Sequence, residues 1–553
     1  MNSNRKKIAL VLALITAVFA LRLIHLGADT PADLTRFSRG VYVDEGYKTL
    51  APRNLVQYGS VKWNAYDTLW DWMKMSPFTQ WSYYGAFRLW GVRVESGRIV
   101  STLYFLAFIC VYAYVFRNRY GSALLMAGLV FLGLESAIFF FSRIAIFEIA
   151  IILFLYLTLF GLLLVEDRNS IWVWAVAVIG GVCNAVLVKG SAILYMVPVF
   201  VGIAASLGAQ NRLTTRKLIV PAAAALAALA VIVVFTGLHG VILNRLGSLS
   251  PAGYARRVLF FRLIENAPVA VVAGVLCSIH GLLADPKYWL QSAYRSALTA
   301  TCLLTPFVVG IFTYNPLRYY VPALPAYILV CLEWYRFASL PRPDLGQSRT
   351  AGSAYGLMVP LFLLVFYLAY GFNEHLLTLL PLDMGEDPGL SVPFLFKWLT
   401  PAAAIATVAI LPFRQLLFSR KLVKTALGGL LVLFVLFNGA RIGNFLVHPS
   451  YASRQIRDQL RQIVPQDSSV AGDWAPFLTL GTGLKTLYVH TLTNPPERIP
   501  LLRPDYFLFC ETEDAMHYLE KLNRMPSVFV RPAIALPDYL GVRLMLYPLG
   551  YRG

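Results

Sequence analysis

The chain has 553 residues, of which 58% are hydrophobic and only 14% are charged, and its mean hydropathy is +0.62. Because an average soluble domain carries about a quarter of charged residues, this composition excludes a water-soluble protein. The formal net charge of +19 does not indicate nucleic acid as a partner, since the Lys and Arg residues lie in short gaps between apolar runs. We expect a membrane protein whose surroundings are lipids.

Apolar segments long enough to cross a bilayer recur along the chain. The first follows MNSNRKK, and we interpret it as a retained span because no small-residue cleavage pattern follows it. The run from Ile171 to Leu207 would form a helix of about 55 Å, against a hydrocarbon core of about 30 Å, so it is predicted to fold back near Lys189 and Gly190. The predicted spans, about thirteen in all, lie near residues 8–26, 98–116, 121–140, 146–165, 171–188, 190–208, 218–236, 267–284, 297–313, 319–335, 354–371, 396–412 and 425–443.

The distribution of basic residues predicts the orientation of these spans. With the N-terminus in the cytoplasm, the basic connections are all cytoplasmic, as the positive-inside rule requires; they are residues 117–119, 212–217, 336–349 and 414–424. The connection 28–97 and the acidic stretch 373–387 then lie on the outer side, as does everything after about residue 444. We therefore predict a multi-pass protein of the inner or plasma membrane with an extracytoplasmic C-terminal segment.

Residues 450–553 differ in character from the rest of the chain. An amphipathic segment at 453–463 is followed by short strand-like runs at 469–472, 486–491, 506–510 and 528–535, which are separated by Pro, Gly and Asp. The predicted fold class is an all-α polytopic membrane module, residues 1–449, followed by a small extracytoplasmic α/β domain, residues 450–553. All six cysteines are isolated, so we expect no disulfide and no zinc site.

The first outer connection is long enough to be functional, and it contains the adjacent carboxylates Asp44 and Glu45. Several aromatic residues follow them: Trp63, Trp70, Trp72, Trp81, Tyr83 and Tyr84. Carboxylates and aromatic rings close to a membrane suit an amphipathic substrate with a polar head. An ordinary solvated acidic pair beside belt aromatics is the alternative interpretation.

Four further ionisable residues lie at predicted outer turns or next to spans. Arg143 and Glu148 lie between the third and fourth spans, where a structural ion pair or stabilisation of a helix N-terminus is the alternative to a functional role. Lys189 and Arg318 adjoin outer ends of spans, where a lipid phosphate would lie. For each of these two cations alone, snorkelling toward lipid headgroups is the alternative.

The segments that carry these residues resemble motifs of the lipid-carrier-dependent glycosyltransferases of the C-type (GT-C) fold, in the branch of the protein O-mannosyltransferases and the aminoarabinose transferases that modify lipid A. The matching segments occur in the expected order: Asp44-Glu45 with Tyr47, APRNLVQYG at 51–59, KMSP at 74–77, SRIAIFE at 142–148 with Glu148 in place of the more usual Asp, Lys189-Gly190, and RYYVP at 318–322. Met73 replaces the Glu usual in aminoarabinose transferases, and Ser76 replaces the first of two prolines. The resemblance therefore does not identify the sugar.

The resemblance implies transfer of a sugar from a polyprenyl phosphate, such as undecaprenyl phosphate, to a lipid, glycan or protein acceptor outside the cytoplasm. We expect Asp44 to act as the general base, with Glu45 steering the proton or assisting a divalent ion and Glu148 orienting the acceptor or holding Arg143. The residues expected to bind the donor phosphate or sugar are Lys74, Arg143, Lys189, Arg318, Tyr319 and Tyr320. No cofactor is expected to be required.

Two other classes of function stay open at this point. A transporter or flippase of lipid-linked sugars would use the same cations without a base, and paired Gly/Pro interruptions of spans would favour it, but the sequence shows no such pairing. A scaffold or sensor protein would need only one membrane anchor, which the many spans argue against. Product formation from a lipid-linked sugar separates the transferase from both.

Overall fold

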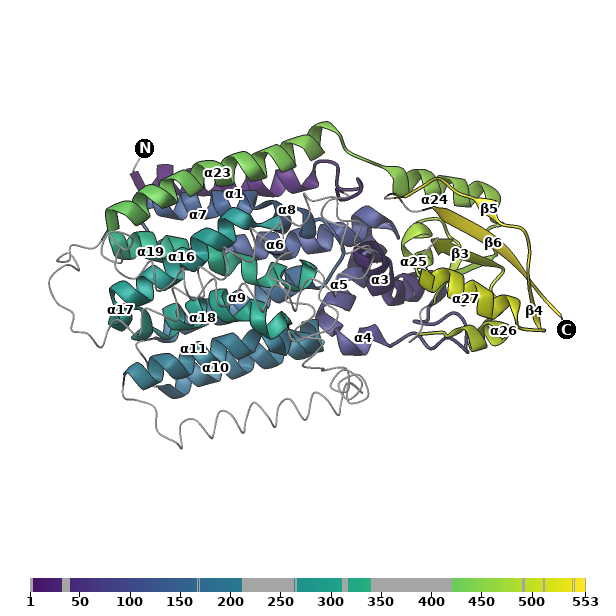
Figure 1. Ribbon diagram of the computed structural model, residues 1–553, viewed down its shortest axis with the longest axis horizontal. Helices are drawn as coiled ribbons and strands as arrows, with labels where there is room; N and C mark the ends of the chain where they lie inside the picture. The colour runs from purple at the N-terminus through teal and green to yellow at the C-terminus, as the bar shows by residue number, and fades with distance from the viewer. Residues whose placement is uncertain are drawn as a thin grey trace, which may run out of the picture. The chain divides into compact units, whose positions relative to one another are not determined.

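The computed structural model describes residues 3–31, 40–166, 168, 170–210, 263, 266–310, 317–339, 420–489, 493–510, 513–539, 541 and 543–552. The chain divides into two compact units, each assembled from segments that are distant in the sequence (Figure 1). Unit 1 comprises residues 1–19, 105–139 and 151–443, and unit 2 comprises residues 20–104, 140–150 and 444–553.

The long apolar runs form helices, because a helix satisfies every backbone polar group within its own segment. Their bounds are α1 (Ser3–Leu23), α6 (Val94–Phe116), α7 (Ser122–Leu134), α8 (Ser136–Phe141), α9 (Glu148–Val165), α10 (Ser170–Cys183), α11 (Met196–Ala209), α16 (Pro268–Ala284), α17 (Pro286–Leu290), α18 (Ala293–Gly310), α19 (Leu324–Ala338) and α23 (Arg420–Val447). Each predicted span that falls on described residues overlaps one of these helices. The predicted spans 218–236, 354–371 and 396–412 lie outside the described residues.

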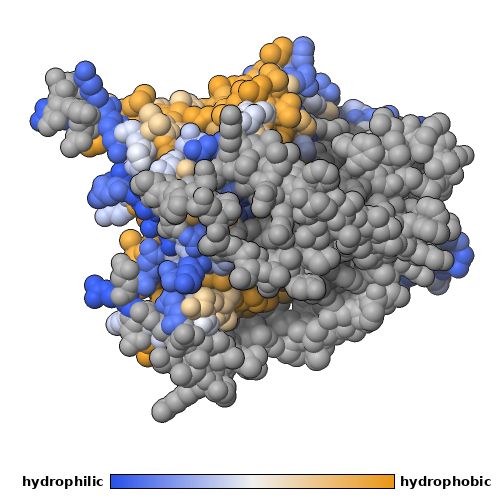
Figure 2. Space-filling view, turned by 60° about the vertical axis from the view of Figure 1, so that its left-hand side comes forward, coloured by the Kyte–Doolittle hydropathy of each residue, from blue (hydrophilic) through white to orange (hydrophobic). Residues whose placement is uncertain are grey.

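Within the described residues, five helices are long and apolar enough to cross a membrane. Apolar side chains also face outward from α1 and α23, among them Ile8, Leu12, Val432 and Leu436, each more than half exposed. In Figure 2 hydrophobic residues gather along the upper edge, where α1 and α23 lie in Figure 1. The apolar helices and this apolar surface together fit a membrane protein. The total of about thirteen spans stays a prediction.

The predicted fold-back near Lys189 is confirmed. Helix α10 continues as a π-helix, Asn184–Val188, after which Lys189 is extended at φ −165° and ψ 128°. A short 3-10 helix, Gly190–Tyr195, then leads into α11, which packs against α10 (Figure 1). Single π-turns and short 3-10 turns often mark a functional break in a helix, and here the break carries the lysine.

Unit 2 contains a six-stranded sheet built from the C-terminal segment, and the α/β prediction for this segment is confirmed. The strands are β1 (Ser469–Gly472), β2 (Lys485–Tyr488), β3 (Tyr506–Cys510), β4 (Val528–Val530), β5 (Ile534–Ala535) and β6 (Leu544–Tyr551), and the helices are α24 (Ala452–Ile463), α25 (Ala475–Leu478), α26 (Ile499–Leu502) and α27 (Glu513–Asn523). The strand order is β2-β1-β3-β6-β4, with β5 also paired to β6. β1 is parallel to β2 and β3, whereas β6 is antiparallel to its neighbours.

The connection between the first two predicted spans, residues 28–97, folds onto this C-terminal segment. It forms α3 (Gly40–Tyr58), α4 (Trp72–Met75) and α5 (Pro77–Trp90). Arg53 is fully buried and donates to Thr479 Oγ1 at 2.9 Å and to the Leu484 carbonyl. Trp63 Nε1 donates to the Thr486 carbonyl at 2.8 Å. The connection and the C-terminal segment therefore share one core, although about 400 residues separate them in the sequence.

Gly46 marks the closest approach between α3 and the C-terminal segment. A Cβ at this position would lie 2.2 Å from the backbone nitrogen of Phe477, so Gly46→Ala must push two backbones apart. We expect the variant to lose about 1–3 kcal/mol of stability, as overpacked cores do, and to melt at a lower temperature in detergent. Gly85→Ala, in α5 with open space at its Cβ, is the matched control. It should melt at or slightly above the wild-type temperature, and an equal loss in both variants would contradict the close packing.

Candidate functional site

The two adjacent carboxylates of α3 have different surroundings. Asp44 is half-buried, whereas Glu45 is fully buried and forms a bidentate ion pair with Arg98, with Nε to Oε1 and Nη2 to Oε2 both at 2.8 Å. Glu45 Oε1 also accepts a hydrogen bond from the Ala145 backbone N–H at 3.0 Å. Glu45 therefore joins the connection 28–97 to the loop between α8 and α9.

Arg98, near the start of α6, also binds the residues that follow the first helix. Its Nη1 donates to the carbonyls of Leu26, at 3.0 Å, and Ala28. A buried guanidinium is tolerated when its charge and its N–H groups are paired in this way. The Glu45–Arg98 pair thus links α3 and the start of α6 to the 143–148 loop and to residues 26–28 in unit 2.

Arg143 binds the end of the first helix. Its guanidinium donates to the carbonyls of Ile24, at 2.7 Å, and His25, at 2.6 Å, and lies 4.6 Å from the centroid of the Phe445 ring. A cation at carbonyls that have no partner within the helix stabilises a helix C-terminus. Glu148 is 2% exposed and is the first residue of α9, where its charge suits the positive end of the helix dipole.

Lys48 lies one turn after Asp44 on α3 and is enclosed by aromatic rings. Its Nζ lies 3.4 Å from the centroid of the Trp72 ring, and the rings of Tyr47 and Phe147 are also close. Trp72 comes from α4 and Phe147 directly precedes Glu148, so three segments meet at this ammonium group. The residue is only 9% exposed.

Lys74, by contrast, lies on the surface of the protein. Its side chain is 84% exposed, and its Nζ pairs with Asp71 Oδ2 at 3.2 Å. An exposed pair of this kind contributes little to stability. The structure thus gathers Asp44, Glu45 and the 143–148 loop in unit 2, but it leaves Lys74 on the surface.

In unit 1, two of the predicted donor-binding cations lie at one tyrosine. Lys189 Nζ is 4.8 Å, and the Arg318 guanidinium 5.2 Å, from the centroid of the Tyr319 ring. Tyr195 donates to the Tyr319 carbonyl at 2.7 Å, and Tyr320 is fully buried. Arg318 lies on a short 3-10 helix, Leu317–Tyr319, and is 5% exposed. This cluster concentrates positive charge, which an anionic group can bind.

The C-terminal segment also anchors the part of the first connection that leads to α4. Asn494, at φ 52°, donates from Nδ2 to Asp67 Oδ1 at 2.7 Å and accepts from the backbone and the hydroxyl of Thr68. Tyr47 stacks on Tyr488, at the end of β2, with ring centroids 4.1 Å apart. Burial raises the pKa of Asp67, although its hydrogen bonds from Asn494 and Leu69 oppose the shift.

The raised pKa of Asp67 predicts a pH-dependent stability. Between the unfolded and the folded pKa values the folded state binds more protons, so this group's contribution is complete at low pH and is lost as the pH rises through the folded value. Melting temperatures between pH 4 and 8 should therefore show Asp67→Asn gaining stability relative to wild type as the pH rises. Curves for Asp67→Asn that run parallel to those of wild type would contradict the prediction.

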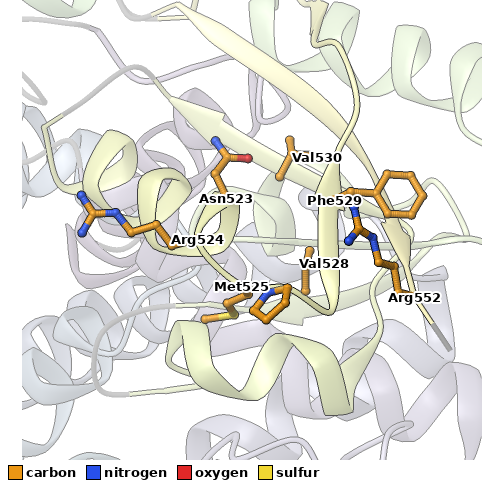
Figure 3. A pocket seen from close by; sticks show the side chains of 8 residues that line it. Asn523, Arg524, Met525, Val528, Phe529, Val530 and Arg552 are labelled. Carbon is orange, nitrogen blue, oxygen red and sulfur yellow. The ribbon is translucent and has the colours of Figure 1, made fainter.

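A separate pocket of about 380 Å³ opens between the end of α27, β4 and the C-terminal end of β6 (Figure 3). It is lined by Asn523, Arg524, Met525, Pro526, Val528, Phe529, Val530 and Arg552. None of the residues predicted from the sequence as site residues lines it, and its lining includes no carboxylate. We therefore place the candidate site at Asp44 and not at this pocket.

In the part of the chain that the structure describes, no group of three or more His, Cys, Asp or Glu residues is placed to hold a metal ion. Glu45, the residue expected to assist a divalent ion, has both oxygens engaged by Arg98 and Ala145. The expectation that no metal is required stays a prediction.

Sequence reasoning did not single out Arg98, Lys48, Tyr195 or Tyr488. Arg98 carried a usable signal, because an ionisable residue at the start of an apolar span is costly and needs a partner. Lys48 also carried one, since its spacing of four from Asp44 places both on one helix face. Nothing in the sequence pairs Tyr488 with Tyr47, which depends on the tertiary fold.

Neither the comparison with protein-family models nor that with curated proteins finds a match. Solved structures do match. The crystal structure of ArnT from Cupriavidus metallidurans in the apo state is 13% identical, with a TM-score of 0.52, and the match covers 99% of this chain and 98% of that one.

Two further structures match with lower scores. ArnT of the same organism bound to undecaprenyl phosphate is 14% identical, has a TM-score of 0.49, and matches over 98% of this chain and 97% of that one. The archaeal oligosaccharyltransferase AglB from Archaeoglobus fulgidus, in complex with an inhibitory peptide and a dolichol-phosphate, is 11% identical, has a TM-score of 0.45, and matches over 90% of this chain and 69% of that one. The similarity to apo ArnT shows the fold: the chain has the C-type glycosyltransferase fold that its motifs predicted.

Proposed function

We propose that this protein is an integral membrane glycosyltransferase that moves a sugar from a polyprenyl-phosphate carrier to an acceptor on the extracytoplasmic side. The observation that carries the proposal is the contact of Glu45 with Ala145 and Arg98. This contact joins the connection 28–97, which carries Asp44 and Glu45, to the 142–148 segment, which carries Glu148. Both segments resemble motifs of the C-type transferases. The fold shared with ArnT over nearly the whole chain supports the same class.

The proposed reaction is a direct displacement. An acceptor hydroxyl or amine attacks the anomeric carbon, its proton passes to Asp44, and the bond from that carbon to the phosphate oxygen breaks with its electron pair going to the phosphate. The configuration at the anomeric carbon is inverted. Because nucleotide sugars are cytoplasmic, an outward-facing transferase needs a donor that crosses the membrane as a lipid.

Within unit 1, the two cations at Tyr319 suit the phosphate of a polyprenyl-phosphate carrier. Arg318 offers bidentate contacts and Lys189 a point charge, and both are held at Tyr319. Positive groups fixed in advance stabilise developing negative charge without reorganising during the reaction. The proposed topology has a cytoplasmic N-terminus and about thirteen spans.

A transporter of lipid-linked sugars is the second candidate, and the interrupted helix at Lys189 favours it. Discontinuous helices that present charged groups at a break are typical of transporter sites, and residues 184–195 form such a break. A transporter, however, needs no base, and it gives the half-buried Asp44 on α3 no role.

The test is product formation by purified protein incubated with a mixture of polyprenyl-phosphate sugars and crude membrane acceptors, followed by mass spectrometry. Appearance of a glycosylated acceptor together with the free polyprenyl phosphate is the expected result, and the mass of the product names the sugar. If the protein moves the intact carrier across liposome membranes and yields no glycosylated product, the transporter is correct instead.

A further inference from the structure

The pocket beside strand β4 is positively charged, and we call it the basic pocket; its lining is the eight residues of Figure 3. Two of them, Arg524 and Arg552, are exposed arginines, and Asn523 adds an amide group. Arg524 pairs with Glu520, but the two side chains are 75% and 56% exposed, and such an exposed pair is weak. An anionic ligand therefore meets a positive charge here that is only partly neutralised.

The Phe529 ring gives the basic pocket a fixed apolar surface. Phe529 lies directly opposite Gly550 in the antiparallel pair of β4 and β6, and directly opposed side chains lie on the same face of a sheet. A Cβ atom at Gly550 would overlap the ring, so the glycine leaves the space that the ring occupies. The ring is thus held against the sheet, although the residue is 39% exposed.

The same strand pairing places Arg552 on the face of this ring. The Arg552 N–H donates to the Ser527 carbonyl at 3.1 Å, which continues the pairing beyond the end of β6. Because side chains alternate between the two faces of a strand, Arg552 lies on the face of Gly550 and therefore of Phe529. Outside the lining, the Arg531 guanidinium lies 5.6 Å from the centroid of the same ring. An aromatic surface and positive charges thus share one face of the sheet.

A ring beside a guanidinium group suits a sugar that carries a carboxylate. The C–H groups of a sugar ring pack on an aromatic face, and its hydroxyls form hydrogen bonds with an amide such as that of Asn523. A carboxylate accepts two parallel hydrogen bonds from one guanidinium. The cavity volume of about 380 Å³ lies in the range of about 300–1,000 Å³ that small-molecule sites have.

Three other anionic partners fit the basic pocket less well. A phosphate group carries a charge of about −1.5 to −2, which exceeds what Arg552 and the partly neutralised Arg524 offer. An acidic peptide added to the sheet edge would pair with β4, but β4 has only three residues, Val528–Val530, and is a short edge. An anionic membrane surface is bound by clusters of about four to eight Lys or Arg residues, whereas two line this pocket.

We propose that the basic pocket binds a carboxylate-bearing sugar, a uronic acid, of the acceptor glycan. The inference rests on the proposed function, because that function supplies a glycan acceptor outside the cytoplasm. It gives the C-terminal segment a part in selecting the acceptor through contacts separate from Asp44. Contacts remote from the reacting atoms hold the ground state and the transition state equally, so they act on KM and not on kcat.

The test measures the affinity of four small probes for purified full-length protein in phosphatidylcholine nanodiscs, by ligand-detected NMR titration. The probes are glucuronate, glucose (the ring without the charge), acetate (the charge without the ring) and glucose 6-phosphate. We expect glucuronate to bind at least about tenfold more tightly than glucose or acetate, because a charge-assisted bidentate contact and ring stacking act together. Glucose 6-phosphate should bind more weakly than glucuronate.

Two variants assign this binding to the basic pocket. Arg552→Gln should bind glucuronate no better than wild type binds glucose, and Phe529→Leu no better than wild type binds acetate. Arg552→Lys, which keeps the charge but loses the bidentate contact, should retain part of the affinity. Arg454→Gln removes an exposed arginine of α24 that does not line the pocket, and as the matched control it should bind like wild type.

Melting temperatures separate a binding defect from misfolding, and Arg524→Gln is a second neutral variant of the lining. Wild-type glucuronate affinity in folded Arg552→Gln, or an equal loss in Arg454→Gln, would overturn the inference and leave the proposed transferase intact. Tighter binding of glucose 6-phosphate than of glucuronate would overturn the choice of a carboxylate. If glucuronate binds through Arg552 but the protein forms no glycosylated product, the uronic-acid site stands and the proposed function fails. If product does form, Arg552→Gln should raise KM for uronate-containing acceptors and leave kcat unchanged.

Discussion

Asp44→Asn is expected to lower the rate of sugar transfer by about 10²–10⁴-fold, the usual contribution of a positioned general base. Asparagine has nearly the same shape as aspartate but cannot take the acceptor's proton. Because the substitution leaves the donor's phosphate contacts in place, we expect the affinity for undecaprenyl phosphate to change little. Initial rates of product formation and binding of the carrier, measured on the same preparation, check both parts.

Asp71→Asn is the matched control for the base. Asp71 lies in the same connection, residues 28–97, but its carboxylate is partly exposed and pairs with Lys74. Transfer by this variant should remain within a few-fold of wild type. If Asp44→Asn keeps full turnover, the assignment of the base is wrong, and Asp71 or Asp67 becomes the candidate that the same assay then tests.

Glu45→Gln is expected to have the largest effect on stability. It leaves the fully buried Arg98 without its counter-charge, and breaking one side of a buried ion pair costs about 3–5 kcal/mol. Transfer should fall as well, because the contact with Ala145 fixes the second loop beside Asp44. Melting temperature and transfer rate, measured in detergent and in nanodiscs, check the two consequences.

Two variants sharpen this prediction. The double variant Glu45→Met with Arg98→Met removes both charges together, so it should be less destabilised than the sum of the two single variants. Asp458→Asn breaks an exposed pair with Arg461, in which both side chains are 51% exposed, and should cost at most about 1 kcal/mol. A loss in Glu45→Gln no larger than that in Asp458→Asn would show that the buried pair is not needed.

Helices and strands with a strong local pattern were predictable from the sequence. The apolar runs of α6, α9, α10 and α11 exceed or approach the length needed to cross a bilayer. The break at Lys189 followed from length alone, because one helix over residues 171–207 would be too long for the hydrocarbon core. In the C-terminal segment, β1 and β3 have the predicted bounds.

Strand β6 was missed for a local reason. Its sequence LMLYPLGY contains Pro548 and Gly550, which are depleted in strands. Pairing with β3, β4 and β5 nevertheless holds the segment extended. The surrounding sheet overrides the local preference, which a reading of the segment by itself cannot detect.

The residues of the candidate site could be predicted from the sequence, but their contacts could not. The sequence motifs indicated Asp44, Glu45, Arg143, Glu148, Lys189 and Arg318. These ionisable side chains lie next to apolar spans, where a charge is costly unless it has a chemical or structural role. The pattern could not show that Glu45 is engaged by Arg98, that Arg143 binds helix carbonyls, or that Lys74 is exposed.

By itself, the sequence determined that this is a membrane protein of many helices with a small α/β segment, since hydropathy and spacing act over neighbouring residues. Only the tertiary structure decided which charges are buried, which carboxylate is tied into an ion pair, and which lysine is exposed. The physical reason is that the burial and the partners of a charge depend on segments distant in the sequence, as when Tyr47 of the first connection meets Tyr488 of the C-terminal sheet.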